Sequence, residues 1–242
     1  MSFLPPLDVL ARLPLLPVML LQGILVRRRA IVLPEAAGAR QGVVGTGQPL
    51  RLLILGDSSA AGVGVEIQQD ALSGQVLDRL ARSRTVHWRL VARTGATTSD
   101  AAGMLQEVSD DTFDVAVLVF GVNDAVRLKR LGPWRRQHAA LRQMLRDEFG
   151  VTTLLVTAVP PLSLFPALPR LLQWILGAHA ERMDRALAED VRKEAGAFHY
   201  TLDLPFSREA MAIDGYHPSA STYALWGRTV AERILAVVSP SG

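Results

Sequence analysis

The chain has 242 residues, of which 49% are hydrophobic and 20% charged, so it is long enough to bury one sizeable core and too apolar to be disordered. The net charge is only +3, from 26 Lys and Arg against 23 Asp and Glu, which argues against nucleic acid as a partner. The absence of cysteine excludes disulfides, thiolate metal ligands and a cysteine nucleophile, although it does not fix the compartment.

The first 50 residues differ in composition from the rest of the chain. An apolar run at 13–26 is followed by three consecutive arginines at 27–29 and then by a glycine-rich segment at 38–49. The run is shorter than the roughly 20 residues that cross a bilayer as a helix, and the charges around it are arranged unlike those of a cleaved secretory signal. We therefore predict an uncleaved apolar extension and link over residues 1–50 and one domain over residues 51–242.

Two interpretations of the apolar segment 3–26 remain open. In the first, residues 3–29 make peripheral membrane contact, with apolar side chains inserted and the arginines at 27–29 lying at anionic head groups. In the second, the segment is a helix that packs on the domain or against a second subunit. We expect a cytoplasmic protein, with membrane association as the open alternative, and the sequence does not determine the oligomeric state.

From residue 51 onward, short apolar runs of β type alternate with amphipathic stretches, which is typical of a parallel sheet with crossover helices. Strands are predicted at residues 51–55, 86–92, 113–120, 152–159 and 198–202. Helices are predicted at residues 68–82, 99–108, 134–149, 171–195 and 219–237. This order predicts an α/β fold, a doubly wound three-layer αβα sandwich on a five-stranded parallel sheet, whose ligands bind at the carboxyl ends of the strands.

Chemically reactive residues follow several of these strands. The first strand runs into a Gly-Asp-Ser turn at Ser58, the second is followed by Gly95, and the third by Asn123. Asp214 and His217 lie beyond the fifth strand. Because the carboxyl ends of parallel strands meet at one edge of the sheet, we expect these residues to lie close together.

These residue types match the parts of a serine nucleophile site. A serine hydroxyl needs a base within hydrogen-bond reach, a carboxylate that orients the base, and N–H donors for the developing oxyanion. Ser58, His217 and Asp214 are candidates for the first three parts, and the backbone N–H of Gly95 and the amide of Asn123 for the donors. Each residue alone also fits a structural role, such as a helix cap or a turn.

Taken together, the motifs resemble the four sequence blocks of the SGNH, or GDSL-type, hydrolases in order and spacing. The resemblance extends over residues 52–218, and it rests on Gly56-Asp57-Ser58, Gly95, Gly121-x-Asn123-Asp124 and Asp214-x-x-His217-Pro218. Ser59 stands where the family commonly has leucine, a difference that concerns the subfamily rather than the activity.

The resemblance implies a flavodoxin-like sandwich and ester hydrolysis through a covalent acyl-enzyme, without a metal or an organic cofactor. It implies that Ser58 is the nucleophile, His217 the general base and acid, and Asp214 its orienting partner. The oxyanion hole is then formed by the backbone N–H groups of Ser58 and Gly95 and by the side-chain amide of Asn123.

The predicted function is that of a serine esterase acting on small-molecule carboxylic esters with short to medium acyl chains. A thioesterase or lysophospholipase, or an O-acyltransferase, would use the same residues, and an acyl- or glycan-binding module is the non-enzyme alternative. The proline-rich segment 160–169 is predicted either to line the acyl site or to pack the next helix.

Overall fold

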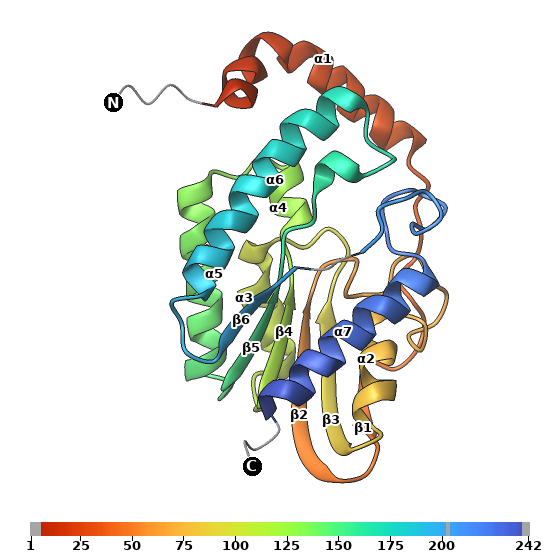
Figure 1. Cartoon of the computed structure of the whole chain (residues 1–242), viewed down its shortest axis with the longest axis vertical. Coiled ribbons are helices and arrows are strands. Elements are labelled where there is room, and N and C mark those ends of the chain that lie inside the picture. The colour runs from red at the N-terminus through yellow and green to blue at the C-terminus, as the bar shows by residue number, and fades with distance from the viewer. Residues whose placement is uncertain (1–5, 202–203, 239–242) are drawn as a thin grey trace.

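A computed structural model of the chain describes residues 6–201 and 204–238 and contains one six-stranded sheet between layers of helices (Figure 1). The strand order is β1-β3-β2-β4-β5-β6. Five strands pair in parallel, namely β2 (Gln48–Gly56), β3 (Arg84–Ala92), β4 (Val115–Val119), β5 (Thr153–Thr157) and β6 (Ala197–Tyr200). The predicted three-layer αβα sandwich is confirmed, and residue 202 of the fifth predicted strand lies outside the described residues.

The prediction of five strands was wrong by one, because β1 (Gln41–Val44) adds an antiparallel edge strand to the sheet. Gln41 lies opposite Arg89 of β3, and Val44 lies opposite Val86. This strand is four residues long, largely exposed and preceded by glycine-rich sequence. It therefore has neither the apolar run nor the length that marks the buried strands.

The central strands form because both of their faces are covered. Leu52, Leu53, Ile54 and Leu55 of β2 are all completely buried. Since side chains alternate between the faces of a strand, Leu52 and Ile54 enter one hydrophobic cluster, and Leu53 and Leu55 enter the other. Such a continuous apolar run is the expected sequence of a parallel strand buried on both sides.

Helices cover both faces of the sheet (Figure 1). On the first face α2 (Leu72–Leu80) packs against α7 (Ala220–Val238). On the second face lie α5 (Leu131–Asp147), α6 (Arg170–Val191) and three short segments, η1 (Thr98–Asp100), α3 (Ala101–Met104) and η2 (Leu105–Val108). The single helix predicted at 99–108 is thus broken into these three segments.

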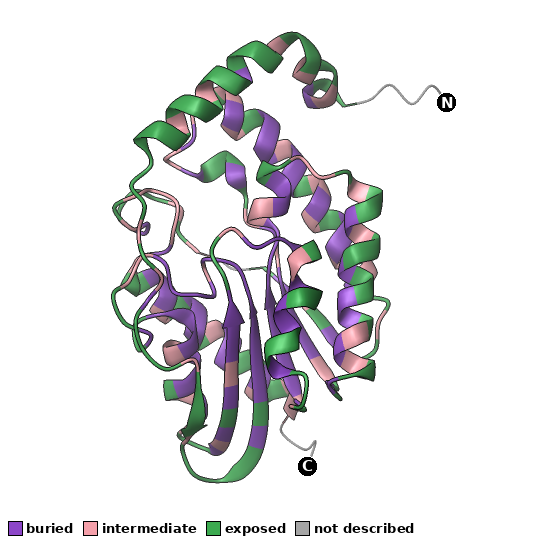
Figure 2. Cartoon of the chain, turned by 180° about the vertical axis from the view of Figure 1, so that it is seen from behind, coloured by how far each residue is buried: buried purple, intermediate pink, exposed green. Residues whose placement is uncertain are grey.

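The N-terminal segment forms a long helix, α1 (Leu7–Arg29), which packs on α6. Figures 1 and 2 place α1 beyond the carboxyl ends of the parallel strands, and most of its surface is exposed. Among the described residues, α1 is long and apolar enough to cross a membrane by length and composition alone. Its place in the molecule puts it at the same end as the loops that carry the predicted site.

Candidate active site

Ser58, His217 and Asp214 lie in one hydrogen-bonded line. The Nε2 atom of His217 is 2.9 Å from Ser58 Oγ, and its Nδ1 atom is 2.6 Å from Asp214 Oδ2. Ser58 and His217 are 159 positions apart in the sequence, so the fold brings them together. With this geometry, the imidazole can accept the hydroxyl proton while the carboxylate holds the opposite ring nitrogen.

Ser58 sits in a tight turn at the end of β2. A Cβ on Gly56 would lie 2.6 Å from the Val119 carbonyl oxygen, so only glycine lets the strand turn this close to β4. Turns rather than a helix follow over residues 58–64, and Ser58 therefore does not act as a helix cap. The turn is closed by Asp57, whose Oδ1 accepts a hydrogen bond from Ser59 N at 3.0 Å.

Asp214 shapes the loop that carries His217. Its Oδ1 accepts the backbone N–H groups of Tyr216 at 2.9 Å and His217 at 3.1 Å, while its Oδ2 faces the imidazole. Burial works to raise the pKa of Asp214, but the hydrogen bonds from the His217 side chain and from these two N–H groups outweigh it, so the pKa lies below its ordinary value. Asp214 is thus held as a carboxylate beside the imidazole.

The two donors predicted for the oxyanion lie on segments that adjoin the nucleophile. Asn123, in the short helix α4 (Val122–Val126), donates from Nδ2 to the Ala96 carbonyl oxygen at 2.9 Å and lies 3.3 Å from Asp57 Oδ2. Gly95 precedes Ala96 and has a φ of +79°, a left-handed conformation that favours glycine. The amide of Asn123 therefore connects the Gly95 turn with the Asp57–Ser58 turn.

Asp57 is a buried carboxyl group beside the site, to which the sequence reasoning gave no role in catalysis. Asp57 is 2% exposed, and this burial raises the pKa of its carboxyl group to about 7. The hydrogen bond from the Ser59 N–H and the charge of His217 act in the opposite direction and lower the pKa. A Gly-Asp-Ser turn at the end of a strand is common turn chemistry, so the sequence did not distinguish this aspartate from an ordinary turn residue.

Asp124 fixes the helix that presents Asn123. The Asp124 carboxylate is completely buried and accepts two hydrogen bonds from Thr98, through its backbone N–H at 3.1 Å and its hydroxyl at 3.0 Å. The Lys129 Nζ atom lies 2.9 Å from the other carboxylate oxygen, and Trp134 Nε1 donates to the Thr98 hydroxyl at 3.2 Å. These contacts of Asp124 tie α4 to η1 and, through Thr98, to α5.

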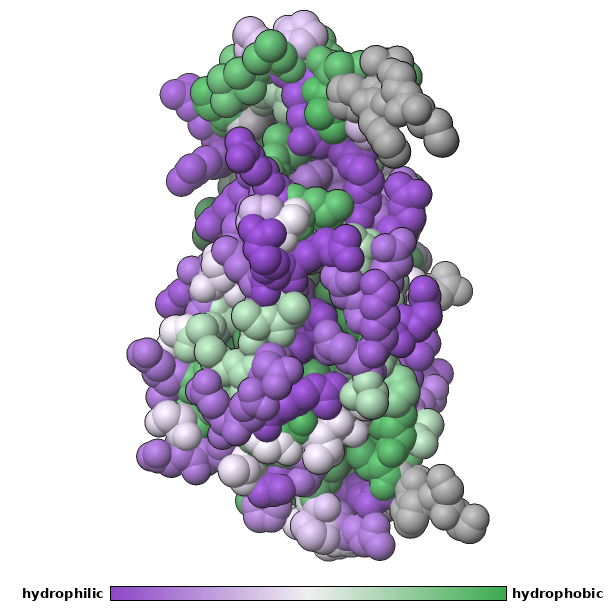
Figure 3. Space-filling view, turned by 90° about the vertical axis from the view of Figure 1, so that its left-hand side faces the viewer, coloured by the Kyte–Doolittle hydropathy of each residue, from purple (hydrophilic) through white to green (hydrophobic). Residues whose placement is uncertain are grey.

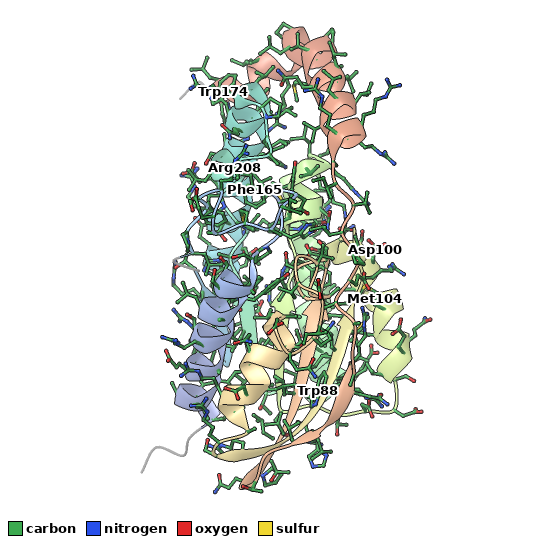
Figure 4. All side chains as sticks on the ribbon, turned by 90° about the vertical axis from the view of Figure 1, so that its right-hand side faces the viewer. Trp88, Asp100, Met104, Phe165, Trp174 and Arg208 are labelled. Atoms are coloured by element: carbon green, nitrogen blue, oxygen red, sulfur yellow. The ribbon has the colours of Figure 1, made fainter. Side chains whose placement is uncertain are left out.

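An apolar cavity of about 400 Å³ opens beside Ser58 and His217. The loop after β5 and the short helix η3 (Leu162–Leu164) form one wall, where Phe165 stacks on Phe206 with ring centroids 5.6 Å apart. Figure 4 shows Phe165 between α1 and the sheet. The proline-rich segment 160–169 therefore lines the cavity, and it also packs against α6.

The part of the cavity lining that follows β5 is hydrogen-bonded to α6 through Asp184. Asp184 Oδ1 accepts a hydrogen bond from the backbone N–H of Val159 at 2.8 Å and lies 2.8 Å from His199 Nε2.

Residues 6–201 and 204–238 contain no group of three or more His, Asp or Glu side chains that could hold a metal ion.

A sequence model of the GDSL-like lipase/acylhydrolase family matches residues 54–225. A GDSL-like esterase of Mycobacterium tuberculosis is 28% identical over 191 residues, which cover 73% of this chain and 59% of that relative. Thus the chain spans less than two thirds of this relative's length. The chain belongs to the GDSL-like lipase/acylhydrolase family.

Solved structures of esterases share the fold at low sequence identity. The psychrotrophic esterase EstA from Pseudoalteromonas sp. is 18% identical with a TM-score of 0.57, over 78% of this chain and 98% of that one. Est24, a carbohydrate acetylesterase from Sinorhizobium meliloti, is 18% identical with a TM-score of 0.56, over 78% of this chain and 99% of that one. These similarities show the sandwich fold and leave the substrate open.

Proposed function

We propose that the protein is a serine esterase that hydrolyses carboxylic esters of short to medium acyl length through an acyl-enzyme on Ser58. The observation that carries the proposal is the line from Ser58 Oγ through His217 to Asp214, with distances of 2.9 Å and 2.6 Å, at the edge of an apolar cavity. A nucleophile, a base and an orienting carboxylate in contact are the recurrent arrangement of acyl-transfer enzymes on unrelated folds.

In the first half of the reaction, Ser58 Oγ attacks the ester carbonyl carbon while His217 Nε2 accepts the hydroxyl proton. Asp214 keeps the Nδ1–H tautomer and stabilises the imidazolium that forms. The tetrahedral intermediate collapses when His217 gives the proton to the departing alkoxide, which leaves the acyl group on Ser58. A water molecule then attacks the acyl-enzyme with the same proton transfers, and the acid product leaves.

The negative charge on the substrate oxygen is the charge that the donors stabilise. An amide has two N–H groups, and Asn123 uses Nδ2 for a short contact with Ala96 O and a longer one, 3.3 Å, with Asp57. We infer that the N–H of the longer contact turns to the oxyanion, together with the backbone N–H groups of Ser58 and Gly95. Donors directed at the oxygen on which negative charge develops stabilise the transition state more than the substrate.

The acyl-length assignment rests on the cavity. Its volume of about 400 Å³ and its apolar walls suit an acyl chain of short to medium length, and ligand cavities in this size range enclose small molecules. A thioesterase, a lysophospholipase or an O-acyltransferase would use the same residues, and these alternatives differ in the leaving group or in the final acceptor.

The domain division at residue 50 and the cytoplasmic location stay predictions. The same holds for membrane contact by residues 3–29, whose structural basis is α1.

The experiment that tests the proposal is hydrolysis of p-nitrophenyl esters from acetate to palmitate by the wild type and by Ser58→Ala. We expect turnover that requires Ser58, with an optimum at short or medium chains. Turnover of acyl thioesters alone would transfer the assignment to a thioesterase, and product that forms only with an added alcohol would transfer it to an acyltransferase. Ester binding without turnover would leave a binding module.

A further inference from the structure

The helix α1 turns its polar side chains toward the protein and its apolar side chains outward. Its buried and half-buried positions include 8, 12, 15, 19, 22 and 26, which alternate steps of four and three residues and therefore lie on one stripe of the helix. Every charged or amide side chain between residues 7 and 26 lies on this inward stripe, namely Asp8, Arg12 and Gln22. A helix on a water-exposed surface has the opposite arrangement, with its polar side chains outward.

The inward stripe is held by an ion pair as well as by apolar packing. The carboxylate of Asp8, a residue that is 4% exposed, accepts hydrogen bonds from both terminal nitrogens of Arg182 of α6, at 2.8 Å and 2.6 Å. It also accepts one from Arg12 at 3.0 Å. Further along, Met19 joins the hydrophobic core cluster. These contacts pair the buried Asp8 carboxylate and hold α1 on α6, whereas Gln22 Oε1 and Arg12 Nε are buried without a hydrogen-bond partner in the part of the chain that the structure describes.

Between residues 7 and 26, the outward face of α1 consists of apolar residues only. The most exposed are Leu7 at 78% and Leu13 at 80%, and the face also includes Leu10, Leu16, Val18, Leu20, Leu21, Ile24 and Leu25. Figure 3 shows hydrophobic residues gathered at this end of the molecule. A continuous exposed apolar surface of this kind marks an interaction site with a protein or a membrane.

Charge at the end of the helix selects between these two partners. The three arginines at 27–29 are exposed and occupy the last turn of α1, directly beyond the apolar face. An apolar helix face next to clustered cations matches the layers of an anionic membrane surface, where acyl chains lie beneath negative head groups.

The same residues argue for a helix that lies in the surface rather than across the bilayer. Between Arg12 and Arg27 the helix has 14 uncharged residues, which rise about 21 Å, whereas the hydrocarbon core is about 30 Å thick. A spanning helix would also have to break the contacts of Asp8 with Arg182.

We propose that α1 is a monotopic membrane-binding element, which seats the folded protein on an anionic lipid surface through its apolar outer face and the arginines at 27–29. Because α1 lies beyond the carboxyl ends of the strands, bound protein turns the end that carries Ser58 and the cavity toward the lipid (Figures 1 and 2). This surface does not depend on the proposed esterase activity.

The test is co-sedimentation of the full chain with vesicles of phosphatidylcholine alone or mixed with phosphatidylglycerol. We expect binding to the mixed vesicles, and a loss of about a hundredfold in affinity when Arg27, Arg28 and Arg29 are changed to Gln. The matched control changes the exposed arginines Arg136, Arg192 and Arg228 to Gln, which removes the same charge elsewhere and leaves binding within about threefold.

The apolar face is tested separately by Leu13→Ser/Leu20→Ser/Ile24→Ser, with Val43→Ser as a control that removes an exposed apolar side chain (57% exposed) from β1. We expect the triple variant to bind at least about tenfold more weakly and the control to bind like the wild type. Circular dichroism and Tm verify that each variant is folded. Because the assay measures vesicle binding, its result does not depend on whether the protein hydrolyses esters. Equal binding of wild type and triple variant, or concentration-dependent dimers that the triple variant abolishes, would overturn the proposal.

The depth of the helix is measured with one introduced thiol, which is unique because the chain contains no cysteine. A fluorophore on Leu10→Cys or Val18→Cys should be quenched by shallow lipid quenchers at both positions. Deep quenching at position 18 with shallow quenching at position 10 would show a spanning helix and contradict the proposal.

Discussion

The Nδ2 atom of Asn123 lies 3.3 Å from Oδ2 of Asp57, so the residue before the nucleophile contacts the amide proposed to bind the oxyanion. Asp57 is almost completely buried, and burial raises its pKa to about 7, although the Ser59 N–H and the charge of His217 lower it. A carboxyl group with a pKa this high makes the stability of the protein depend on pH near neutrality.

Asp57→Asn is therefore expected to change the pH dependence of stability. From pH 3.8 to about 7 the unfolded state has an ionised Asp57 while the folded state keeps the proton, so this residue lowers the wild-type free energy of unfolding as pH rises. Each pH unit in that window corresponds to about 1.4 kcal/mol. Urea unfolding from pH 4 to 8 should show Asp57→Asn gaining stability relative to wild type up to about pH 7, whereas a constant difference would contradict the shifted pKa.

Asn123→Ala is expected to lower kcat by about a hundredfold or more and to change KM little. The amide contacts the substrate oxygen mainly when negative charge develops, so its loss raises the barrier rather than weakening binding of the ester. The measurement is steady-state hydrolysis of the best p-nitrophenyl ester, with Tm as a control for folding. A higher KM at unchanged kcat would remove Asn123 from the oxyanion hole.

The role of the Gly95 N–H is tested by a pair of glycine substitutions. Gly95 and Gly150 both have positive φ, +79° and +68°, and a Cβ at either position would meet nothing within 4 Å. Alanine at either position should therefore cost similar stability, about 1–2 kcal/mol, through backbone strain. Only Gly95→Ala should also lower kcat, by about tenfold or more, because strain there displaces an oxyanion donor; equal kcat in both variants would argue against this role.

Chain-length preference is tested by two phenylalanines that are each 3% exposed. Phe165 lines the cavity, whereas Phe113 lies just before β4 in the core. Either change to alanine should destabilise the fold by about 3–5 kcal/mol. Phe165→Ala alone should move the optimum of the ester series to longer acyl chains, and a shift in Phe113→Ala of the same size would show that the optimum reports stability rather than cavity shape.

The buried strands, and the meeting of the candidate site residues at one edge of the sheet, could be predicted from the sequence because local patterns and the order of the elements determine them. The run from Leu52 to Leu55 is apolar enough to identify a strand buried on both faces, and the structure extends it only to Gln48–Gly56. Ser58, Asp214 and His217 follow strands of one parallel sheet, so the topology itself brings them to one edge.

Features that depend on tertiary contacts were not predictable in the same way. The strand β1 is stabilised by pairing with β3 rather than by its own sequence, which is short and rich in glycine. The buried position of Asp57 arises from the packing of its turn against β4, where its N–H bonds the Val119 carbonyl oxygen at 3.0 Å. The inward direction of Asp8 required knowledge of its partner Arg182, which lies 174 positions away.

The central claim is that Ser58 is the nucleophile, and covalent trapping tests it most directly. With a p-nitrophenyl alkylphosphonate, Ser58 Oγ should attack the phosphorus atom and expel p-nitrophenolate. The phosphonyl group then stays bonded to Ser58 Oγ. Mass spectrometry of the digested protein should find one label per chain, on the peptide that contains Ser58, and no label or ester turnover in Ser58→Ala. Labelling at another residue, with turnover retained in Ser58→Ala, would contradict the account.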